Sequence, residues 1–533
     1  MLSRSLFSVN PSSTTDATEE QRAGSFGESL ATGGRRREER NQPTSSRRAR
    51  EPRMSGMADS FTKAHNEYSR LAVKATSLIL NDLWAKKTIP EDGWTEHTIE
   101  LFLQWIASHD SNNRIDMSPL GAGEREGRVA SSIVRRLHCN MSHGVGRSGN
   151  LCEIQPKFAM HALKLLGLES IRGTVVVPCA TGMSLMLCMA HWRKNKPQAR
   201  YVVWSRVDQK SCFKSILAAG YEPVIVDPVR QGDALVTDIE GVKRALERHG
   251  DEVLCVMSTT SAFAPRAPDD LEAIGSLCAS HGVYHLVNNA YGLQSAECVR
   301  RIMETKSYGG RIDAVVQSLD KNFQVPVGGA IVTFFKQSHA RDFAQFYPGR
   351  ASCVPVRDFV ITLLGQGSEY DRQRRLFERM RRKLRAFADE IGESVYEVHD
   401  NVISLAMTLC SIPANKQTLF GAVLFSRGIT GARYEALLQK IRPSNLRTRL
   451  RNATVIEGHE FVNFGSHSRE QHAGYMNIAC AVGMREDEVD ELFSRMASTY
   501  ARFCRKNLGR EVRMNGGDNQ ESAEDDDDLA GPY

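Results

Sequence analysis

The chain has 533 residues, of which 41% are hydrophobic and 25% charged, and its formal net charge is +6. This length is too great for one compact core and predicts two folded domains with tails, while the lack of any run of about 18 apolar residues excludes a membrane-spanning helix. The twelve cysteines form no CxxC pair, so we expect no disulfide framework, no metal site and a reducing compartment, by default the cytoplasm.

The two ends of the chain differ in charge. Residues 1–57 are rich in Ser, Thr, Gly and Arg, whereas residues 511–533 hold eight acidic side chains against one Arg. Both segments have too few apolar residues to offset the entropy of ordering, so we expect a disordered basic extension and a disordered acidic tail. The body between them is basic, which favours a polyanionic partner only weakly, because many enzymes are equally basic.

Amphipathic helices are predicted over 65–85 and 97–108, and short apolar runs alternate with helical stretches from 130 to 340. Such runs are typical of buried parallel strands, whose faces are both covered by crossover helices. The sequence therefore predicts an α/β sheet that binds ligands at the carboxyl ends of its strands. The predicted strands are Thr174–Val177, Tyr201–Trp204, Pro223–Val226, Val253–Met257, Tyr284–Val287, Ala314–Val316 and Ala330–Phe334.

A long helix is predicted over 369–391, with apolar residues on one side and mostly arginines on the other. We interpret the basic side as a solvated surface, and contact with a phosphate backbone is the less favoured alternative. Further strands over 400–510 and a closing helix that contains Val489 and Phe503 indicate a smaller second domain.

Lys321 follows the predicted strand Ala314–Val316 within the sequence SLDKNF. A lysine at a strand end, in the mouth of an α/β sheet, is well placed to form a Schiff base with an aldehyde cofactor if its amine is partly desolvated and neutral. Most lysines in loops are simply solvated. For Lys321, the position directly after a buried strand favours the Schiff-base role over a solvated side chain.

Two other strand ends offer groups that such a cofactor needs. Ala180 and Thr181 lie where a strand joins an apolar helix, and this turn would present backbone N–H groups and a hydroxyl to a phosphate, the alternative being an ordinary N-cap. Asn289 ends the strand Tyr284–Val287, where many enzymes of this architecture place an aspartate. Because Asn289 is uncharged, a cofactor ring bound beside it would be a weaker electron sink. The competing interpretation is that Asn289 only forms a structural turn.

Glycine-rich basic segments supply further anion-binding groups. The segment Gly121–Arg128 superficially resembles a dinucleotide fingerprint, but it follows no strand and fails that test. The segments 143–157 and 347–352 combine backbone donors, hydroxyls and arginines, which suit a dianionic phosphate on a substrate, although each alone is a common surface feature. The side chains concerned are Arg147, Ser148, Gln155 and Arg350.

Ten motifs together resemble O-phosphoseryl-tRNA(Sec) selenium transferase, a family of eukaryotes and archaea. They run in order from about residue 58 to about residue 506 and include GEREGRVAS, HGVGRSG, ATGMSL, DQKSCFKS, STTSAFAPR, NNAYG, SLDKNF, VPVGGA, YPGRAS and ISLAMTL. The resemblance implies a pyridoxal phosphate-dependent transferase of fold type I, an α/β protein with a large mixed-sheet domain and a smaller C-terminal α+β domain. It also implies conversion of O-phosphoseryl-tRNA(Sec) to selenocysteinyl-tRNA(Sec) with selenophosphate, by phosphate elimination and selenium addition.

The same resemblance implies an organisation of the chain. After the extension 1–57, residues 58–115 would form a helical oligomerisation segment, 116–390 the pyridoxal phosphate-binding catalytic domain and 391–510 the small domain, followed by the tail 511–533. The family is homotetrameric, with sites at subunit interfaces.

The motifs also imply roles for individual residues. Lys321 would be the catalytic lysine that holds the cofactor, which Arg125, Ala180, Thr181, Gln209 and Asn289 would also contact. The substrate phosphate would be held by Arg147, Ser148, Gln155 and Arg350. Contacts with tRNA would come from Arg427 and Lys506, and also from Tyr308, which stands where the family can carry an arginine and would act by stacking.

A second departure from the family pattern lies between Lys157 and Thr174, where about a helix's worth of chain is missing.

Two alternative functions remain open. One is a sulfur-using transferase or lyase, acting on phosphoseryl-tRNA or cysteine, for which Cys353 would be the reactive thiol, although most isolated cysteines are buried and inert. The other is a non-catalytic tRNA-binding homologue, against which the retained Lys321, Arg125 and Arg147 argue.

Overall fold

A computed structural model describes residues 83, 85–108, 150–348, 352–367, 373–429, 433–435, 453–469, 474–512 and 514. The chain divides into two units, Met1–Tyr68 and Ser69–Tyr533, and every described residue belongs to the second. The predicted extension 1–57, nearly all of the predicted tail 511–533 and nearly all of the predicted helix over 65–85 lie outside the described residues.

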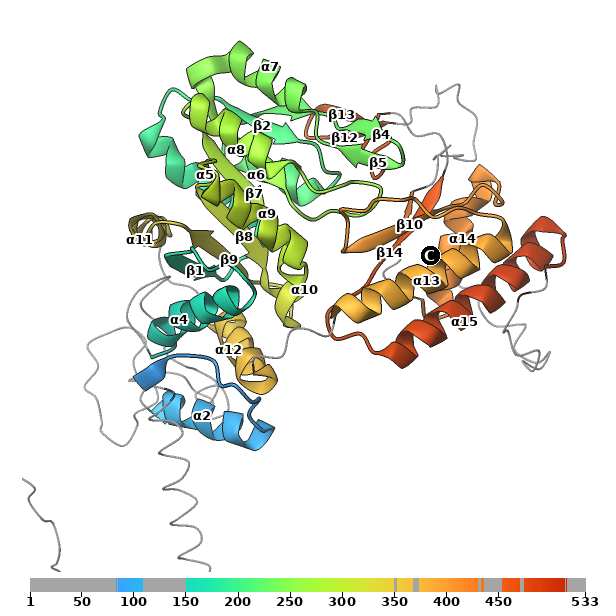
Figure 1. Cartoon of the computed structure of the whole chain (residues 1–533), viewed down its shortest axis with the longest axis horizontal. Helices are drawn as coiled ribbons and strands as arrows, with labels where there is room; N and C mark the ends of the chain where they lie inside the picture. Colours follow the sequence, from blue (N-terminus) through green and yellow to red (C-terminus); the bar gives the residue numbers. More distant parts are fainter. Residues whose placement is uncertain are drawn as a thin grey trace, which may run out of the picture. The chain divides into compact units, whose positions relative to one another are not determined.

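The main sheet has seven strands in the order β1-β9-β8-β7-β6-β2-β3 (Figure 1). All seven were predicted, and their ends agree with the prediction to within two residues, because continuous apolar runs in this chain are strands buried on both faces. The strands are β1 Gly173–Val177, β2 Tyr201–Ser205, β3 Glu222–Val226, β6 Val253–Thr259, β7 Tyr284–Asn288, β8 Ala314–Ser318 and β9 Ala330–Phe334.

The direction of β9 makes the main sheet mixed, as the family resemblance implied, although the apolar runs alone predicted parallel strands. It runs antiparallel to both of its neighbours, β1 and β8, whereas β2, β3, β6, β7 and β8 pair in parallel. The reason is the connection 319–329, since a parallel crossover needs about a dozen residues or more. Because β1 and β8 both oppose β9, the carboxyl ends of β1, β8, β7, β6 and β2 share one edge of the sheet.

Helices cover both faces of the sheet, and β2 shows the alternation. Val202 and Trp204 pack into a core with α5, α6 and α11, whereas Val203 packs into a core with α7 and α8. A third cluster joins α2, α4, α9 and α12 to β7, β8 and β9. The helices and short turns of this part are α2 Glu96–Ser108, α4 Asn150–Leu165, α5 Thr181–Trp192, η1 Arg193–Asn195, α6 Lys210–Ala218, α7 Ile239–His249, η2 Gly250–Glu252, α8 Leu271–Ser280, η3 Gly292–Gln294, α9 Ala296–Ser307, α10 Leu319–Phe323, α11 Gln337–Phe346 and α12 Val354–Gln366.

A second, smaller sheet has the order β10-β14-β11 and packs against three helices around its own core. The long helix predicted over 369–391 and the closing helix are two of them. No helix among the described residues is long and apolar enough to cross a membrane. The elements are α13 Gln373–Ile391, β10 Ser404–Thr408, α14 Ala414–Ser426, β11 Arg433–Glu435, β14 Tyr475–Ala479, α15 Glu486–Phe503 and the π-helical turn η4 Cys504–Leu508.

Two hairpins lie outside these sheets: β4 Val229–Gln231 with β5 Ala234–Val236, and β12 Ala453–Ile456 with β13 His459–Val462. The β12–β13 hairpin precedes β14 in the chain but packs on the main sheet, beside β2 (Figure 1). The ring of Phe461 on β13 lies edge-on to that of Phe213 on α6, with 4.8 Å between ring centroids. A segment from the C-terminal part of the chain therefore covers the helix that starts at the carboxyl end of β2.

Candidate active site

Three strand ends at the carboxyl edge of the main sheet carry the residues singled out from the sequence. Thr181 begins α5 after β1, Asn289 follows β7, and Lys321 lies in α10, directly after β8. Two contacts tie these ends to the start of α6. A Cβ added at Gly182 would lie 3.0 Å from the Ser211 Cβ, and the Asn288 amide donates to the Cys212 sulfur at 3.2 Å.

Lys321 is half-buried, and its amine makes two polar contacts and one cation–π contact. Its Nζ lies 3.2 Å from the Ser318 Oγ and 3.2 Å from the Asp320 Oδ2, and 5.3 Å from the centre of the Tyr291 ring. The Gln294 amide donates to the backbone oxygen of Lys321. The lysine is therefore fixed by its neighbours on α10 and by the loop after β7, with its amine at the edge of the sheet.

Lys321 also lies close enough to Cys212 for its positive charge to favour ionisation of the thiol, but the effect of burial outweighs that of the charge. Burial raises the pKa of Cys212 to about 12, while the positive charge of Lys321 and the hydrogen bond from Asn288 act in the opposite direction. The thiol therefore stays protonated at neutral pH and serves as a packing group and a weak hydrogen-bond acceptor.

Asn289 is completely buried, and its orientation is set by one strong contact. The Thr260 hydroxyl lies 2.5 Å from the Asn289 Oδ1, so this oxygen accepts and the Nδ2 group is left to donate. The Nδ2 atom is buried without a hydrogen-bond partner among the described residues. Asn289 therefore presents an unused donor, which suits an acceptor atom of a ligand.

Thr181 is the first residue of α5, and its hydroxyl is buried without a hydrogen-bond partner in the described part of the chain. The N-cap residue, Ala180, has no side chain that can satisfy the free N–H groups of the first turn. An unpaired hydroxyl and unpaired N–H groups at the positive end of a helix form a binding site for an anion. The ordinary N-cap interpretation of Thr181 does not hold, because Ala180 occupies the cap position.

These groups fit pyridoxal phosphate. Lys321 offers an amine for its aldehyde, the first turn of α5 with Thr181 offers donors for its phosphate, and Asn289 offers a donor for its ring. Gly182 permits the close approach of α5 and α6 beside the anion site, since any larger side chain would meet the backbone oxygen of Ser211 at 3.1 Å.

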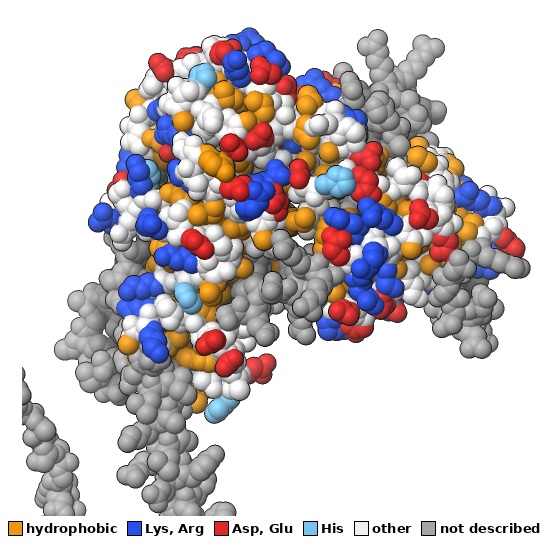
Figure 2. Space-filling view, in the orientation of Figure 1, with side chains coloured by type: hydrophobic (Ala, Val, Ile, Leu, Met, Phe, Trp, Pro, Cys, Tyr) orange, Lys and Arg blue, Asp and Glu red, His pale blue; other side chains and the backbone are white. Residues whose placement is uncertain are grey.

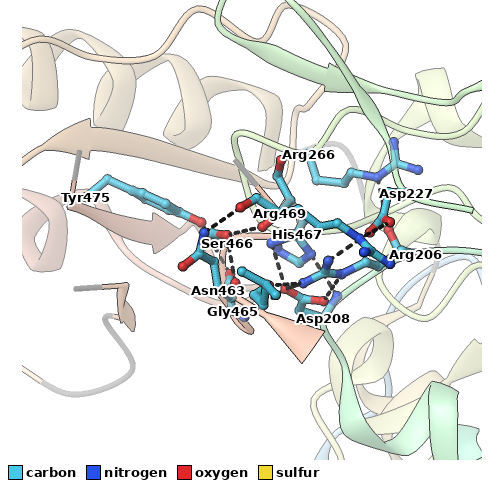
Figure 3. Close-up of polar contacts among 12 residues, drawn as sticks. Arg206, Asp208, Asp227, Arg266, Asn463, Gly465, Ser466, His467, Arg469 and Tyr475 are labelled. Carbon is cyan, nitrogen blue, oxygen red and sulfur yellow. Dashed lines mark hydrogen bonds and ion pairs between the residues drawn. The ribbon is translucent and has the colours of Figure 1, made fainter. Parts of the chain in front are cut away.

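Gln209, the remaining described residue of the predicted cofactor set, is the N-cap of α6. The residue before it, Asp208, is buried in a network with Arg206 and with the turn 463–469 that follows the β12–β13 hairpin (Figure 3). Asp208 accepts from the Arg206 guanidinium at 2.7 Å and from the His467 backbone N–H at 2.7 Å. The position of Gln209 thus depends on residues more than 250 positions later in the chain.

Arg125 of the predicted cofactor set lies outside the described part of the chain. The same holds for most of the residues predicted to bind the substrate phosphate, namely Arg147, Ser148 and Arg350. Gln155 lies on α4, but its side chain is not among those described. Their roles therefore stay predictions.

The three predicted tRNA-binding residues lie on three different elements. Arg427 is the half-buried C-cap of α14, Lys506 is exposed on η4, and Tyr308 is the C-cap of α9 with 70% of its surface exposed. Such exposure of a large aromatic ring leaves it accessible for stacking.

The basic side of α13 is a surface of ion pairs, as Figure 2 shows where Lys and Arg side chains gather over this helix beside acidic ones. Asp490 on α15 lies 2.6 Å from Arg379 and 2.8 Å from Lys383, and these two cations lower the pKa of its carboxyl. The Arg385 guanidinium lies 2.6 Å from Glu397. These pairs favour the solvated-surface interpretation over contact with a phosphate backbone.

Cys353, the candidate thiol of the sulfur-using alternative, is the half-buried N-cap of α12 and packs against the hydrophobic core formed by α2, α4 and α12. A packed position of this kind is typical of a structural cysteine. Among the described residues, no group of three or more His, Cys, Asp and Glu side chains is placed to hold a metal ion.

Several residues of the site were not singled out from the sequence. Asp320 adjoins Lys321, and its carboxylate beside the amine was a signal that strand-end reasoning could have used. Thr260 and Gln294 come from other loops. His467 lies in a segment with no local motif, so its contact with Asp208 was accessible only from the folded structure.

Comparison with known proteins places these features in a family. Residues 109–501 match the sequence profile of the family described as "O-phosphoseryl-tRNA(Sec) selenium transferase, SepSecS". The chain is 57% identical over 479 residues to the O-phosphoseryl-tRNA(Sec) selenium transferase of Caenorhabditis briggsae, covering 86% of this chain and 96% of that protein. It is 36% identical over 474 residues to the enzyme of that name from Dictyostelium discoideum, covering 81% and 96%.

Among solved structures, the fold matches the crystal structure of archaeal O-phosphoseryl-tRNA(Sec) selenium transferase with a TM-score of 0.69, at 24% identity, over 81% of this chain and 97% of that one. The fold type I architecture, a large mixed sheet with a smaller α+β part, is thereby confirmed.

Proposed function

Because the chain belongs to the O-phosphoseryl-tRNA(Sec) selenium transferase family, we propose that it converts O-phosphoseryl-tRNA(Sec) to selenocysteinyl-tRNA(Sec) with pyridoxal phosphate held by Lys321. One observation supports this assignment most directly: the Lys321 amine lies at the same sheet edge as two buried donors. These donors are the Thr181 hydroxyl and the Asn289 amide, and neither has a partner among the described residues. A lysine and two unused donors around one strand edge are what an aldehyde cofactor with a phosphate and a ring requires.

The binding residues have distinct tasks. Thr181 and the N-terminal N–H groups of α5 hold the phosphate of the cofactor, since the positive end of a helix stabilises a dianion. Asn289 donates to the ring from Nδ2, because its Oδ1 already accepts from Thr260. Arg125 and Gln209 complete the cofactor contacts implied by the family motifs.

Lys321 moves the proton that starts the reaction. Its Nζ takes the proton from the substrate Cα, and Asp320 and Ser318, each 3.2 Å from Nζ in this structure, hold the amine at the sheet edge. The chemistry that pyridoxal phosphate would supply there is an electron sink for the pair that Cα keeps as this proton leaves. Because Asn289 is uncharged, the residues at the ring favour expulsion of a good leaving group over more demanding carbanion chemistry.

The leaving group is the substrate phosphate. The Cβ–O bond breaks, its electron pair goes to the phosphate oxygen, and Arg147, Ser148, Gln155 and Arg350 stabilise the departing dianion. A selenium nucleophile then adds at Cβ, and Lys321 returns its proton to Cα. With selenophosphate as the donor, hydrolysis of the Se–P bond releases a second phosphate and leaves the selenol.

The assembly and the donor follow from the family resemblance. We propose selenophosphate as the selenium donor, tRNA(Sec) contacts through Arg427, Lys506 and Tyr308, a homotetramer and a cytoplasmic location. The domain limits proposed are those expected from the sequence, with the catalytic domain at 116–390 and the small domain at 391–510. Light scattering on the purified protein tests the oligomeric state.

The assignment is tested by Lys321→Ala, with Lys336→Ala as the matched control, because Lys336 is an exposed lysine after β9. Purified wild-type protein is expected to bind pyridoxal phosphate with visible absorbance, and borohydride reduction is expected to fix the cofactor on the peptide that contains Lys321, as read by mass spectrometry. Lys321→Ala should lose that absorbance and all release of phosphate from O-phosphoseryl-tRNA(Sec), while Lys336→Ala keeps both. Unchanged turnover in Lys321→Ala would remove the assignment.

A further inference from the structure

The network around Asp208 joins the turn 463–469 to the residue directly before Gln209 (Figure 3). Two backbone contacts are reciprocal: the Asp208 N–H donates to the His467 Nδ1 at 2.8 Å, and the His467 N–H donates to the Asp208 Oδ2 at 2.7 Å. The Gly465 N–H donates to the same oxygen at 2.8 Å, and Arg206 donates to both carboxylate oxygens. The carboxylate of Asp208 is therefore saturated with donors from two separate parts of the chain.

The His467 side chain has a defined tautomer in this arrangement. A backbone N–H is always a donor, so the Nδ1 atom that accepts from it carries no proton, and neutral His467 carries its proton on Nε2. His467 also has a φ of +61°, in the left-handed region that non-glycine residues rarely adopt. A residue held there is fixed by its surroundings, and such positions gather at functional sites.

Attachment of the hairpin alone does not require this network. The hairpin is already anchored by Phe461, which is 2% exposed and packs on Phe213, and by a surface ion pair between Lys214 and Glu457 at 2.8 Å. The side chains of Arg206 and Asp208, by contrast, are 1% and 0% exposed. Burying a charged pair carries a desolvation cost and gives little net stability, but it fixes geometry.

The geometry fixed is that of the first turn of α6. Asp208 precedes Gln209, whose backbone oxygen accepts from the Cys212 N–H at 3.0 Å and whose N–H donates to the Val207 oxygen at 2.6 Å. The same turn meets the anion-binding start of α5 through Ser211 and Gly182. Any displacement of Asp208 is therefore passed to Gln209 and to the contact between α5 and α6.

We propose that Asp208 and His467 are a positioning pair that sets the cofactor affinity of the site by holding Gln209 and the first turn of α6 in place. The proposal rests on the proposed function, because it takes the first turns of α5 and α6 as part of the cofactor site. It assigns to the C-terminal turn 463–469 a task in the catalytic part of the chain, beyond its own packing.

Three substitutions of His467 separate positioning from packing. In His467→Asn the Oδ1 atom takes the place of Nδ1 and can accept from the Asp208 N–H, and asparagine adopts positive φ more readily than most residues. In His467→Gln the amide reaches the place of Nε2 instead, so that the Asp208 N–H loses its acceptor while a polar side chain of similar size remains. His467→Ala removes every side-chain contact. Lys214→Ala is the control, because it breaks a contact between the hairpin and α6 without touching Asp208.

The measurement is the dissociation constant for pyridoxal phosphate, by titration of cofactor-free protein, together with urea unfolding of the same cofactor-free proteins. His467→Gln and His467→Ala are expected to weaken binding about tenfold, equivalent to about 1.4 kcal/mol, whereas His467→Asn and Lys214→Ala stay within about threefold of wild type.

Equal affinities in the Asn and Gln variants would overturn the positioning role, and this comparison stands even where His467→Ala does not fold. Failure of the wild-type protein to bind pyridoxal phosphate at all would instead refute the cofactor assignment, and with it this proposal.

Discussion

Gly292→Ala is the substitution that tests most directly whether the orientation of Asn289 matters. A Cβ added at Gly292 would lie 1.8 Å from the Asn289 Oδ1 and 2.7 Å from its Cγ, distances that atoms in proteins do not adopt. The Asn289 side chain must therefore rotate away and give up its 2.5 Å contact with the Thr260 hydroxyl. The backbone at Gly292 is not in the left-handed region, so the change acts through this clash.

The expected cost has two parts. Leaving buried hydrogen-bonding groups unpaired costs about 1–3 kcal/mol, and forcing a methyl group into a packed site costs about 1–3 kcal/mol more. The free energy of unfolding of the cofactor-free protein should therefore fall by about 2–6 kcal/mol. The affinity for pyridoxal phosphate should fall as well, because the Asn289 amide that is proposed to donate to the ring is displaced.

Urea unfolding of cofactor-free wild type, Gly292→Ala, Asn289→Ala and the double variant measures the coupling between the two positions. With the Asn289 amide removed there is little left to clash, so Gly292→Ala should cost less than about 1 kcal/mol in the Asn289→Ala background. Gly365→Ala on α12 is the control, since among the described residues its Cβ would meet only the Ile99 Cδ1, at 3.6 Å, and alanine is the better helix former. The reasoning is wrong if Gly292→Ala costs as much without the Asn289 amide as with it.

Two further predictions concern stability. Burial lowers the pKa of His285 from 6.5 to about 4. As the pH falls, the unfolded chain therefore takes up a proton at a higher pH than the folded chain does. The stability that neutral His285 contributes is complete above pH 6.5 and is lost as the pH falls toward 4. Urea unfolding at pH 7 and pH 5 should show a drop that is smaller in His285→Gln, and an equal drop in both proteins would contradict the assignment. Phe461→Ala should lower the unfolding free energy by about 3–5 kcal/mol, because it empties a buried ring site. Val455→Ala, at a side chain 60% exposed on the same hairpin, should leave the unfolding free energy nearly unchanged. Similar losses in both variants would show that the hairpin is not anchored by Phe461.

The strands of the main sheet were predictable because each is a short, continuous apolar run, and Ala330–Phe334 agrees at both ends. Their direction was not, since a run of apolar residues reads the same in either direction. The length of the connection 319–329 was the available signal for the antiparallel course of β9.

The placement of Lys321, Thr181 and Asn289 at strand ends of one sheet edge was predictable, because each follows an apolar run directly, and their roles stay predictions. Partners contributed by distant loops were not predictable, because sequence spacing says nothing of which loops meet. Thr260 orients Asn289 from the end of another strand, and His467 reaches Asp208 across 259 positions. Both contacts are products of packing rather than of local pattern.

The course of β9 also bears on how the protein is made. Strand β1 stands at one end of the main sheet and pairs with β9 alone, so residues 173–177 have no neighbour in that sheet until residues 330–334 have been synthesised. The strand that leads into Thr181 therefore gains its sheet partner only after Lys321 has been synthesised. The proposed anion-binding turn and the lysine, although far apart in the chain, are thus expected to come together late, and nascent chains that end before β9 are expected not to retain the cofactor.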